Sequence, residues 1–357
     1  MRRALSFNDV LIVPTQNEIK SRDDVDTTSR VGLINLQTPL IAANMPSVCE
    51  THMAIALGKL GALGIIHRMQ SIASQAAMVE EARFTLGSEA SVGAAVGVGS
   101  DAVERTEQCV ASGANVVCLD VAHGHQSRVL HTAQQVLHHN EDITLIIGNL
   151  ATANAVQYFC DELYADLPRI VFKVGVGGGS LCLTRVRTGC GLPTFQSLYD
   201  VLGHDYTVTE DVTVSRPEIN VIADGGIKSS GDIVKSLAVG ASSVMLGSLL
   251  SGTNEAPGDV YRDGNQFVKI YRGAASHGEK KKFYGKSEYV EGAEAFVPYK
   301  GSVSVIVEQL MDGLRSGMTY CGASTLGELK QRAEFVHITA AGHQESSPHL
   351  LVSRGSY

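Results

Sequence analysis

The chain has 357 residues, of which 44% are apolar and 18% are charged, and its formal net charge is −8 at pH 7. This apolar content is enough to bury a large core, so we expect a folded protein rather than a disordered one. The negative charge removes the general attraction to nucleic-acid and membrane phosphates, so neither is an expected partner.

The cysteines and the amino-terminal segment indicate the compartment. Seven cysteines, an odd number without a paired CxxC pattern, favour reduced thiols over a disulfide framework or a zinc site. Asn8 and Asp9 interrupt the first apolar stretch, so it lacks the core of a signal peptide. No run reaches the length of a transmembrane helix. We therefore expect a cytoplasmic protein.

Eight apolar or β-branched runs recur along the chain and alternate with segments of helical periodicity. The expected strands are residues 39–45, 63–68, 91–97, 115–122, 144–151, 169–177, 219–226 and 242–249. Amphipathic segments between them include residues 74–84, 101–112, 126–138, 152–163 and 230–239. Parallel strands need crossover segments of this kind. The pattern predicts an α/β fold, a (β/α)8 TIM barrel in which residues 1–357 form a single catalytic domain.

A doubly wound sheet is the alternative to the barrel. That fold binds a dinucleotide through G-x-G-x-x-G after an early strand. The nearest match, residues 175–180, follows the sixth strand and has serine in place of the third glycine. The motif is therefore a weak dinucleotide signal, and the barrel is favoured.

Two long connections interrupt the repeat, at residues 184–218 and 251–301. The second contains no stretch of convincing helical period, and long segments without regular structure in an enzyme are usually lids or binding loops. We expect a flap insertion after the eighth strand, at about residues 271–301. The polar tail, residues 342–357, is expected to be mobile in part.

Cys182 lies in a glycine-rich loop, residues 174–193, that follows the sixth strand. The carboxyl ends of barrel strands form the catalytic face, and glycines let the backbone approach a ligand closely. Most free cysteines are small buried hydrophobes, and Cys109, Cys118 and Cys160 fit that description. Because Cys182 lies in a polar loop instead, we expect its thiolate to act as a nucleophile.

Other strands also end in polar residues or glycines. The seventh ends in Asp-Gly-Gly at residues 224–226, and the eighth ends in Gly-Ser at residues 247–248. Loops at these two positions of a TIM barrel commonly bind phosphate. Asp120 ends the fourth strand and Asn149 ends the fifth, so they add polar groups to the same rim.

The motif KVGVGGGSLCLTRVRTGCGLP, residues 173–193, resembles the catalytic loop shared by IMP dehydrogenases and GMP reductases. The similarity extends from SFNDVLIVP at residue 6 to ESSPH at residue 345 and includes IADGGIKSSGDIVKSLAVGASSVMLGS, YRGAAS and VPYKG. It implies a purine nucleoside monophosphate substrate, a nicotinamide cofactor and a homotetramer. In this family a cysteine attacks C2 of the purine and forms a covalent thioimidate.

The resemblance also assigns roles by position. Cys182 resembles the nucleophile, Thr184 the hydroxyl that handles the group entering or leaving C2, and Glu291 the acid or base partner of that threonine. The residues that resemble substrate contacts are Ser180, Asp224, Gly226, Gly247, Ser248, Tyr271, Gly273 and Ala274. The residues on the cofactor side are Asp120, Asn149 and Gly175. A potassium ion would be bound by Gly177, Gly179 and Cys182, with Glu345 from a neighbouring subunit.

The chain departs from the family pattern at several positions. Pro46 replaces a usual aspartate, Leu183 a usual threonine and Ala274 a usual methionine, which leaves the choice between guanine and hypoxanthine open. The second and third strands leave no room for the regulatory CBS pair that many IMP dehydrogenases insert.

The flap distinguishes the two reactions of the family. Dehydrogenases hydrolyse the thioimidate with a long flap that carries an Arg-Tyr pair, whereas residues 273–291 are short and lack that pair. Together with Ala-Ala-Asn-Met at residues 42–45, this favours NADPH-dependent reductive deamination of GMP to IMP and ammonia. Tyr-Arg-Gly at residues 271–273 and the tail at residues 341–349 resemble dehydrogenases. Oxidation of IMP to XMP with NAD therefore stays the alternative, and a non-catalytic purine-nucleotide-binding barrel is a further one.

Overall fold

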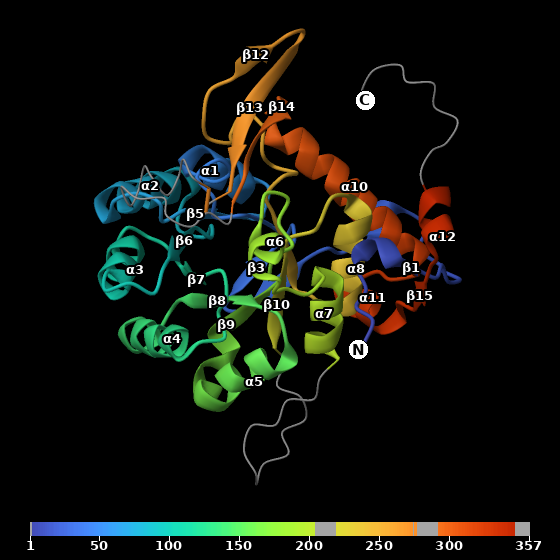
Figure 1. Cartoon of the computed structure of the whole chain (residues 1–357), viewed down its shortest axis with the longest axis horizontal. Coiled ribbons are helices and arrows are strands. Elements are labelled where there is room, and N and C mark those ends of the chain that lie inside the picture. The colour runs from blue at the N-terminus through green and yellow to red at the C-terminus, as the bar shows by residue number, and fades with distance from the viewer. Residues whose placement is uncertain (1, 204–218, 274, 277–291, 347–357) are drawn as a thin grey trace.

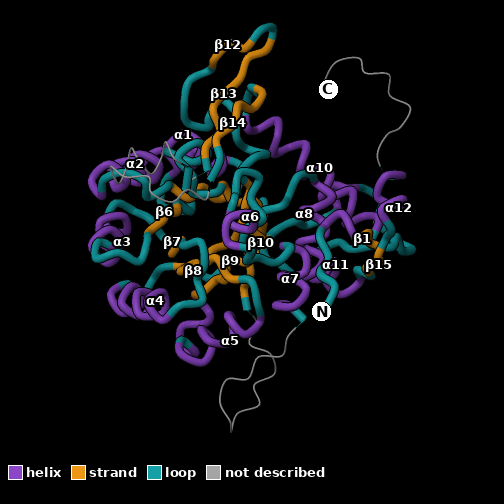
Figure 2. The backbone as a smooth tube through the Cα atoms, viewed as in Figure 1, coloured by secondary structure: helices purple, strands orange, loops and turns teal. Residues whose placement is uncertain are grey.

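The computed structural model describes residues 2–203, 219–273, 275–276 and 292–346. Eight parallel strands close into a barrel in the order β10-β11-β4-β5-β6-β7-β8-β9. These strands are β4 (Leu40–Ala42), β5 (Leu63–Ile66), β6 (Gly93–Val96), β7 (Val116–Asp120), β8 (Thr144–Leu150), β9 (Ile170–Val174), β10 (Asn220–Asp224) and β11 (Ser243–Leu246). The strands lie in the centre of the molecule and helices surround them (Figure 1, Figure 2). The predicted (β/α)8 TIM barrel is confirmed.

The barrel strands form the core of the molecule. Every residue of β5, β6, β9 and β11 is buried. Helices cover the outside of the barrel and side chains fill its inside, so both faces of each strand are removed from water. This explains why the strands appear in the sequence as continuous apolar runs rather than as alternating patterns.

The helices follow the strands as crossover connections. They are α1 (Thr51–Lys59), α2 (Ile72–Leu86), α3 (Ala102–Ala111), α4 (Ser127–His139), α5 (Ala153–Glu162), α7 (Thr194–Leu202), α8 (Ser230–Val239) and α10 (Val303–Tyr320). In four of them, a serine or threonine before the first turn accepts a hydrogen bond from a backbone N–H of that turn: Ser71, Thr152, Ser229 and Ser302. These caps satisfy amide groups that a helix start leaves unpaired, and they fix where the helices begin.

The two long connections contain more regular structure than the sequence predicts. The first contains α7 and a short helix, α6 (Thr184–Thr188). The second contains an antiparallel sheet of β12 (Tyr261–Asp263), β13 (Gln266–Arg272) and β14 (Glu294–Pro298), which projects from the barrel (Figure 1). The expectation of a segment without regular structure is wrong for these residues. All of β12 and most of β14 are exposed, so their sequences lack the apolar pattern by which strands are predicted.

Smaller elements lie beside the barrel. Strand β1 (Val10–Ile12) pairs with β15 (Phe335–His337), and β2 (Ser29–Val31) pairs with β3 (Ile34–Leu36). In the described part of the chain, the remaining elements are α11 (Leu326–Arg332), α12 (Ala340–Glu345) and three 3-10 turns, η1 (Phe7–Asp9), η2 (Arg22–Asp24) and η3 (Tyr164–Arg169). The predicted tail thus begins inside a helix, and its residues 347–357 lie outside the described part of the chain. None of the described helices combines the length and the hydrophobicity that crossing a membrane requires.

Helix α1 packs directly on β5 at Gly64, where an added Cβ atom would overlap the Cα atom of Ala54. We expect Gly64→Ala to lower the free energy of unfolding by about 1–3 kcal/mol, the usual cost of overpacking a core. Gly327→Ala in α11 is the control, because a Cβ atom there would meet nothing closer than 3.8 Å. Urea unfolding followed by circular dichroism compares the three proteins. Equal stability of Gly64→Ala and wild type would contradict the close packing of α1 on β5.

Candidate active site

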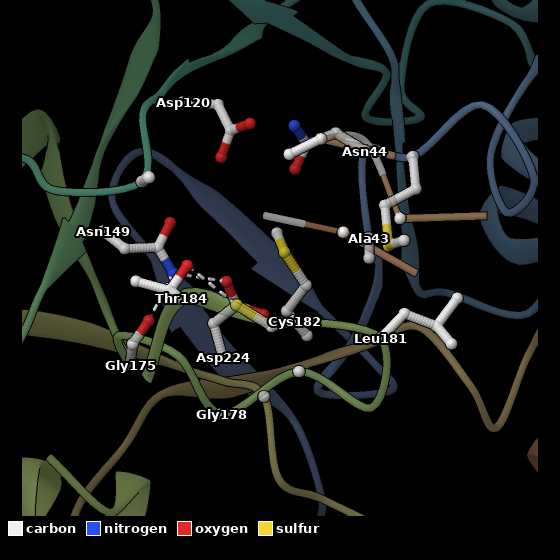
Figure 3. A pocket seen from close by; sticks show the side chains of 18 of the residues that line it. Ala43, Asn44, Asp120, Asn149, Gly175, Gly178, Leu181, Cys182, Thr184 and Asp224 are labelled. Atoms are coloured by element: carbon white, nitrogen blue, oxygen red, sulfur yellow. Dashed lines mark hydrogen bonds between the residues drawn. The ribbon is translucent and has the colours of Figure 1, made fainter. Parts of the chain in front are cut away.

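A cavity of about 420 Å³ opens at the carboxyl ends of the barrel strands. Asp120, Asn149 and Asp224 line it from β7, β8 and β10, and the glycine-rich loop after β9 supplies Cys182. Figure 3 shows these four side chains around one space. Active sites of TIM barrels lie at this end of the strands, and the volume suits a small ligand. The cavity is therefore the candidate active site.

Cys182 presents its thiol to this cavity. It is half-buried, and its Sγ donates a hydrogen bond to Thr184 Oγ1 at 3.1 Å. Cys109, Cys118 and Cys160 are buried in the core as expected, and burial raises the pKa of Cys118 to about 12. A thiol with so high a pKa stays protonated at neutral pH, so of these four cysteines Cys182 is the one suited to act as a nucleophile.

The loop that carries Cys182 depends on a close backbone approach. Gly175 has φ +145°, and an added Cβ atom would overlap the carbonyl oxygen of Asp224. Only glycine fits there, which is the physical reason for the first glycine of the loop. The backbone N–H of Cys182 then donates to Gly179 O at 3.0 Å, so the loop turns back on itself just before the thiol.

Residues 273 and 292–293, at the two described ends of the predicted flap, support the same loop. Cys182 and Gly292 form an antiparallel bridge, and the N–H of Ala293 donates to the carbonyl oxygen of Leu181 at 2.9 Å. The N–H of Gly273 donates to Ala293 O at 2.9 Å. Residues far apart in sequence thus hold the thiol in place.

A buried ammonium joins the polar residues of the cavity. Lys173, on β9, is 1% exposed, and its Nζ donates to Asp120 Oδ1 at 2.9 Å and to Asn149 Oδ1. Asp224 Oδ2 accepts from the same Nζ at 3.3 Å and from Asn149 Nδ2 at 2.6 Å. Gly148 leaves the room that this arrangement needs, because a Cβ atom there would lie 2.6 Å from the Cβ of Lys173.

These contacts shift the protonation equilibria of the cluster. Burial alone would lower the pKa of Lys173, but the charges of Asp120 and Asp224 outweigh it and raise that pKa above its ordinary value. Burial alone would raise the pKa of Asp120, but the charge and hydrogen bond of Lys173, with help from Arg68 and Asn44, lower it. Both partners therefore stay charged at neutral pH.

The loops after β10 and β11 lie at the edge of the cavity. Gly225 is pressed against the backbone of Gly178, and Gly247 lies beneath the hydroxyl of Tyr271. Burial, and then the charge of Asp224, raise the pKa of that tyrosine, so its hydroxyl keeps its proton and can donate. The ammonium of Lys300 donates to Ser248 O at 2.7 Å and fixes the second loop.

The structure brings most of the sequence-predicted residues together. The cavity is lined by Asp120, Asn149, Gly175, Gly177, Gly179, Ser180, Cys182, Thr184, Asp224, Tyr271 and Gly273. Residues near its edge but not lining it are Gly226, Gly247 and Ser248. Glu345 is exposed in α12 and does not line the cavity of its own chain. Glu291 and Ala274 lie outside the described residues.

Three of the polar side chains that line the cavity have no role predicted from the sequence. Lys173, Arg68 and Asn44 line the cavity, and the last two act on the pKa of Asp120. A signal for Lys173 was present, because a lysine inside the apolar run Ile170–Val174 is rarely buried without a charged partner. No comparable signal marks Arg68 or Asn44.

Comparisons with known proteins agree with this geometry. A family model described as the IMP dehydrogenase / GMP reductase domain matches residues 4–349. An inosine-5'-monophosphate dehydrogenase of Nitrosopumilus maritimus is 31% identical, and the alignment covers 98% of this chain and 98% of the relative. One of Cryptosporidium parvum is 33% identical, covering 97% and 95%. One of Streptococcus pyogenes is 44% identical, covering 72% of this chain and 52% of the relative.

The lowered pKa of Asp120 predicts a pH-dependent contribution to stability. Such a carboxylate stabilises the fold fully above its unfolded pKa of about 3.9, and the contribution is lost as pH falls through the native pKa. We expect Asp120→Asn to lower the urea midpoint at pH 7, and we expect its difference from wild type to shrink below about pH 4. Asp312→Asn, at an exposed position of α10, is the control. A difference in urea midpoint between Asp120→Asn and wild type that stays constant with pH would contradict the ion pair of Asp120 with Lys173.

Proposed function

Because the chain belongs to the IMP dehydrogenase / GMP reductase family, we propose that it oxidises IMP to XMP with NAD as cofactor and water as co-substrate. The observation that carries the proposal is the half-buried thiol of Cys182, hydrogen-bonded to Thr184 at the mouth of the barrel. The relatives named above are IMP dehydrogenases, and two of them match nearly the whole chain. This similarity favours IMP oxidation over GMP reduction, the reaction that the flap sequence at residues 273–291 favours.

The proposed chemistry takes place at the sulfur of Cys182. The thiol loses its proton, and the sulfur forms a bond to C2 of IMP, which gives up a hydride and leaves a thioimidate. Water then attacks C2, the C–S bond breaks, XMP departs and the thiol is restored. Sulfur suits both halves of this sequence, because a thiolate is a strong nucleophile and also a good leaving group.

Thr184 can assist at both stages. Its hydroxyl accepts from the thiol at 3.1 Å, and once the sulfur has lost its proton the same hydroxyl can donate to it. In the family pattern the partner of this hydroxyl corresponds to Glu291, and a positioned acid or base contributes about 100-fold to 10,000-fold in rate. We assign the pair to activation of the attacking water.

The nucleotide would be bound by the loops after β9, β10 and β11. We assign the ribose hydroxyls to Asp224, and the phosphate to Ser180, Gly226, Gly247 and Ser248, with Tyr271 as a donor. These residues suit those groups chemically, because a carboxylate accepts hydrogen bonds from hydroxyls and the backbone of a turn can donate N–H groups to an anion.

NAD, when bound, supplies the hydride acceptor. The cavity wall fits its ribose and carboxamide groups, because Asp120 keeps 26% of its side chain exposed while one oxygen is bound to Lys173. Asn149 and Gly175 lie next to it on the same wall. We assign these three residues to the cofactor side. A potassium ion on Gly177, Gly179 and Cys182, and a homotetramer that brings Glu345 from a neighbouring subunit, belong to the same proposal.

GMP reduction with NADPH is the second candidate. It is favoured by one specific observation, the absence of an Arg-Tyr pair in residues 273–291, since that pair activates water in dehydrogenases. Both reactions use the same nucleophile and differ in whether water or ammonia enters or leaves C2.

Two assays test the proposal. We expect the purified enzyme to reduce NAD with IMP faster than it oxidises NADPH with GMP, as followed by nicotinamide absorbance. Cys182→Ser should lower turnover about 1,000-fold or more, because a serine hydroxyl is not ionised at neutral pH, while IMP binding persists. Cys190→Ser is the matched control, since Cys190 is exposed and does not line the cavity. Faster GMP reduction would replace the dehydrogenase with the reductase, and failure of both reactions would favour a binding protein.

A further inference from the structure

One buried ammonium is shared by two carboxylates that the proposed function assigns to different ligands. Among the described residues, Lys173 Nζ has three acceptors, Asp120 Oδ1, Asn149 Oδ1 and Asp224 Oδ2. An ammonium has three N–H donors, so each donor has one acceptor and none remains for water. The side chain is 1% exposed, which agrees with this closed arrangement.

The four residues come from neighbouring strands. Asp120, Asn149, Lys173 and Asp224 lie on β7, β8, β9 and β10, which are adjacent in the barrel. The side chain of Asn149 closes the cluster, because it accepts from Lys173 and donates to Asp224 at 2.6 Å and to Gly175 O at 2.7 Å. The cluster therefore spans the cavity wall from the cofactor side to the nucleotide side.

Neither carboxylate can move without affecting the other. If ribose hydroxyls donate to Asp224, they hold that carboxylate in place, and the ammonium bound to it becomes fixed as well. Asp120 is bound to the same ammonium, so it is held ready for its own ligand before that ligand arrives. Prior ordering of a binding group removes part of the entropic cost of the second binding event.

We propose that Lys173 is a positioning residue that couples the nucleotide site to the cofactor site. The inference rests on the proposed function, since that function assigns Asp224 to the nucleotide and Asp120 to the dinucleotide. Lys173 touches neither ligand in this account and acts through the two aspartates. Its signature is a cofactor affinity that depends on whether the nucleotide is bound.

The test measures binding of NADH by fluorescence with and without saturating IMP, a pair that cannot react in either direction. The readout is the coupling factor, the ratio of the two dissociation constants. In the wild-type enzyme IMP should tighten NADH binding about fivefold or more, the lower end of ordinary coupling between sites. Lys173→Met should lose most of this factor, whereas Lys173→Arg, which keeps a cation, should retain most of it.

Direct contact between the two bound ligands contributes equally to the coupling factor of every variant, so it cancels when the factors are compared. Lys235→Met is the matched control, because Lys235 is a half-buried lysine of α8 whose Nζ donates to Phe7 O outside the cavity. It should leave the coupling factor unchanged. A wild-type factor in Lys173→Met, or no coupling in the wild type, would overturn the inference while leaving the proposed function intact. Absence of IMP binding to the wild-type protein would overturn both.

Lys173→Met removes the ammonium that two half-buried carboxylates share, and this loss can prevent folding. The double variant Lys173→Met/Asp120→Asn removes one charge of each sign. The net charge of the cluster is therefore the same as in the wild type. Asp120→Asn alone is its reference, because it lacks the same carboxylate but keeps the ammonium, and the amide oxygen of the new asparagine can still accept from that ammonium. The inference predicts a lower coupling factor in the double variant than in Asp120→Asn, and equal factors would contradict it.

Discussion

The buried ammonium of Lys173 determines how the strand ends are arranged at the mouth of the barrel. Removing a cation from water costs several kcal/mol, and the cost is offset only where charged or polar acceptors surround it. Three acceptors do so here, and they come from β7, β8 and β10. The ends of these strands, and the shape of the cavity between them, therefore depend on one charge. Gly148 leaves the space that the lysine side chain occupies.

The thiol of Cys182 is held by backbone contacts rather than by charged side chains. Cys182 lies on a loop that begins at Gly175. Only glycine fits at position 175, because a Cβ atom there would overlap the carbonyl oxygen of Asp224. The loop is supported from the far side by Gly292 and Ala293. The polar cluster and the backbone-supported loop line the same cavity, and Asn149 joins them through its hydrogen bond to Gly175 O. The charged residues of the cluster lie on β7, β9 and β10, and Cys182 lies on the loop.

The sequence predicts the barrel well and its additions poorly. Buried parallel strands produce apolar runs, so runs such as 169–177 indicate β9, although the predicted strand extends beyond Val174 into the loop. The sheet of β12 to β14 was not predicted, because exposed strands carry no such run. Gly264-Asn265, the two-residue turn between β12 and β13, was a local cue for that hairpin. The pairing of β13 with β14 joins segments far apart in the sequence and had no such cue.

The site divides in the same way. Asp224 could be identified because it ends a strand that a glycine-rich turn follows, and Cys182 could be identified because it lies in the glycine-rich loop after β9. Lys173 could be noticed as a lysine inside an apolar run, but its role could not be assigned, because its partners Asp120 and Asp224 lie 53 and 51 positions away in the sequence. The central claim is covalent catalysis by Cys182, and mass spectrometry of the enzyme quenched during turnover with IMP and NAD tests it most directly. The account predicts a purine nucleotide adduct on the peptide that contains Cys182, formed only when both compounds are present. Steady turnover without that adduct, or an adduct on another residue, would contradict it.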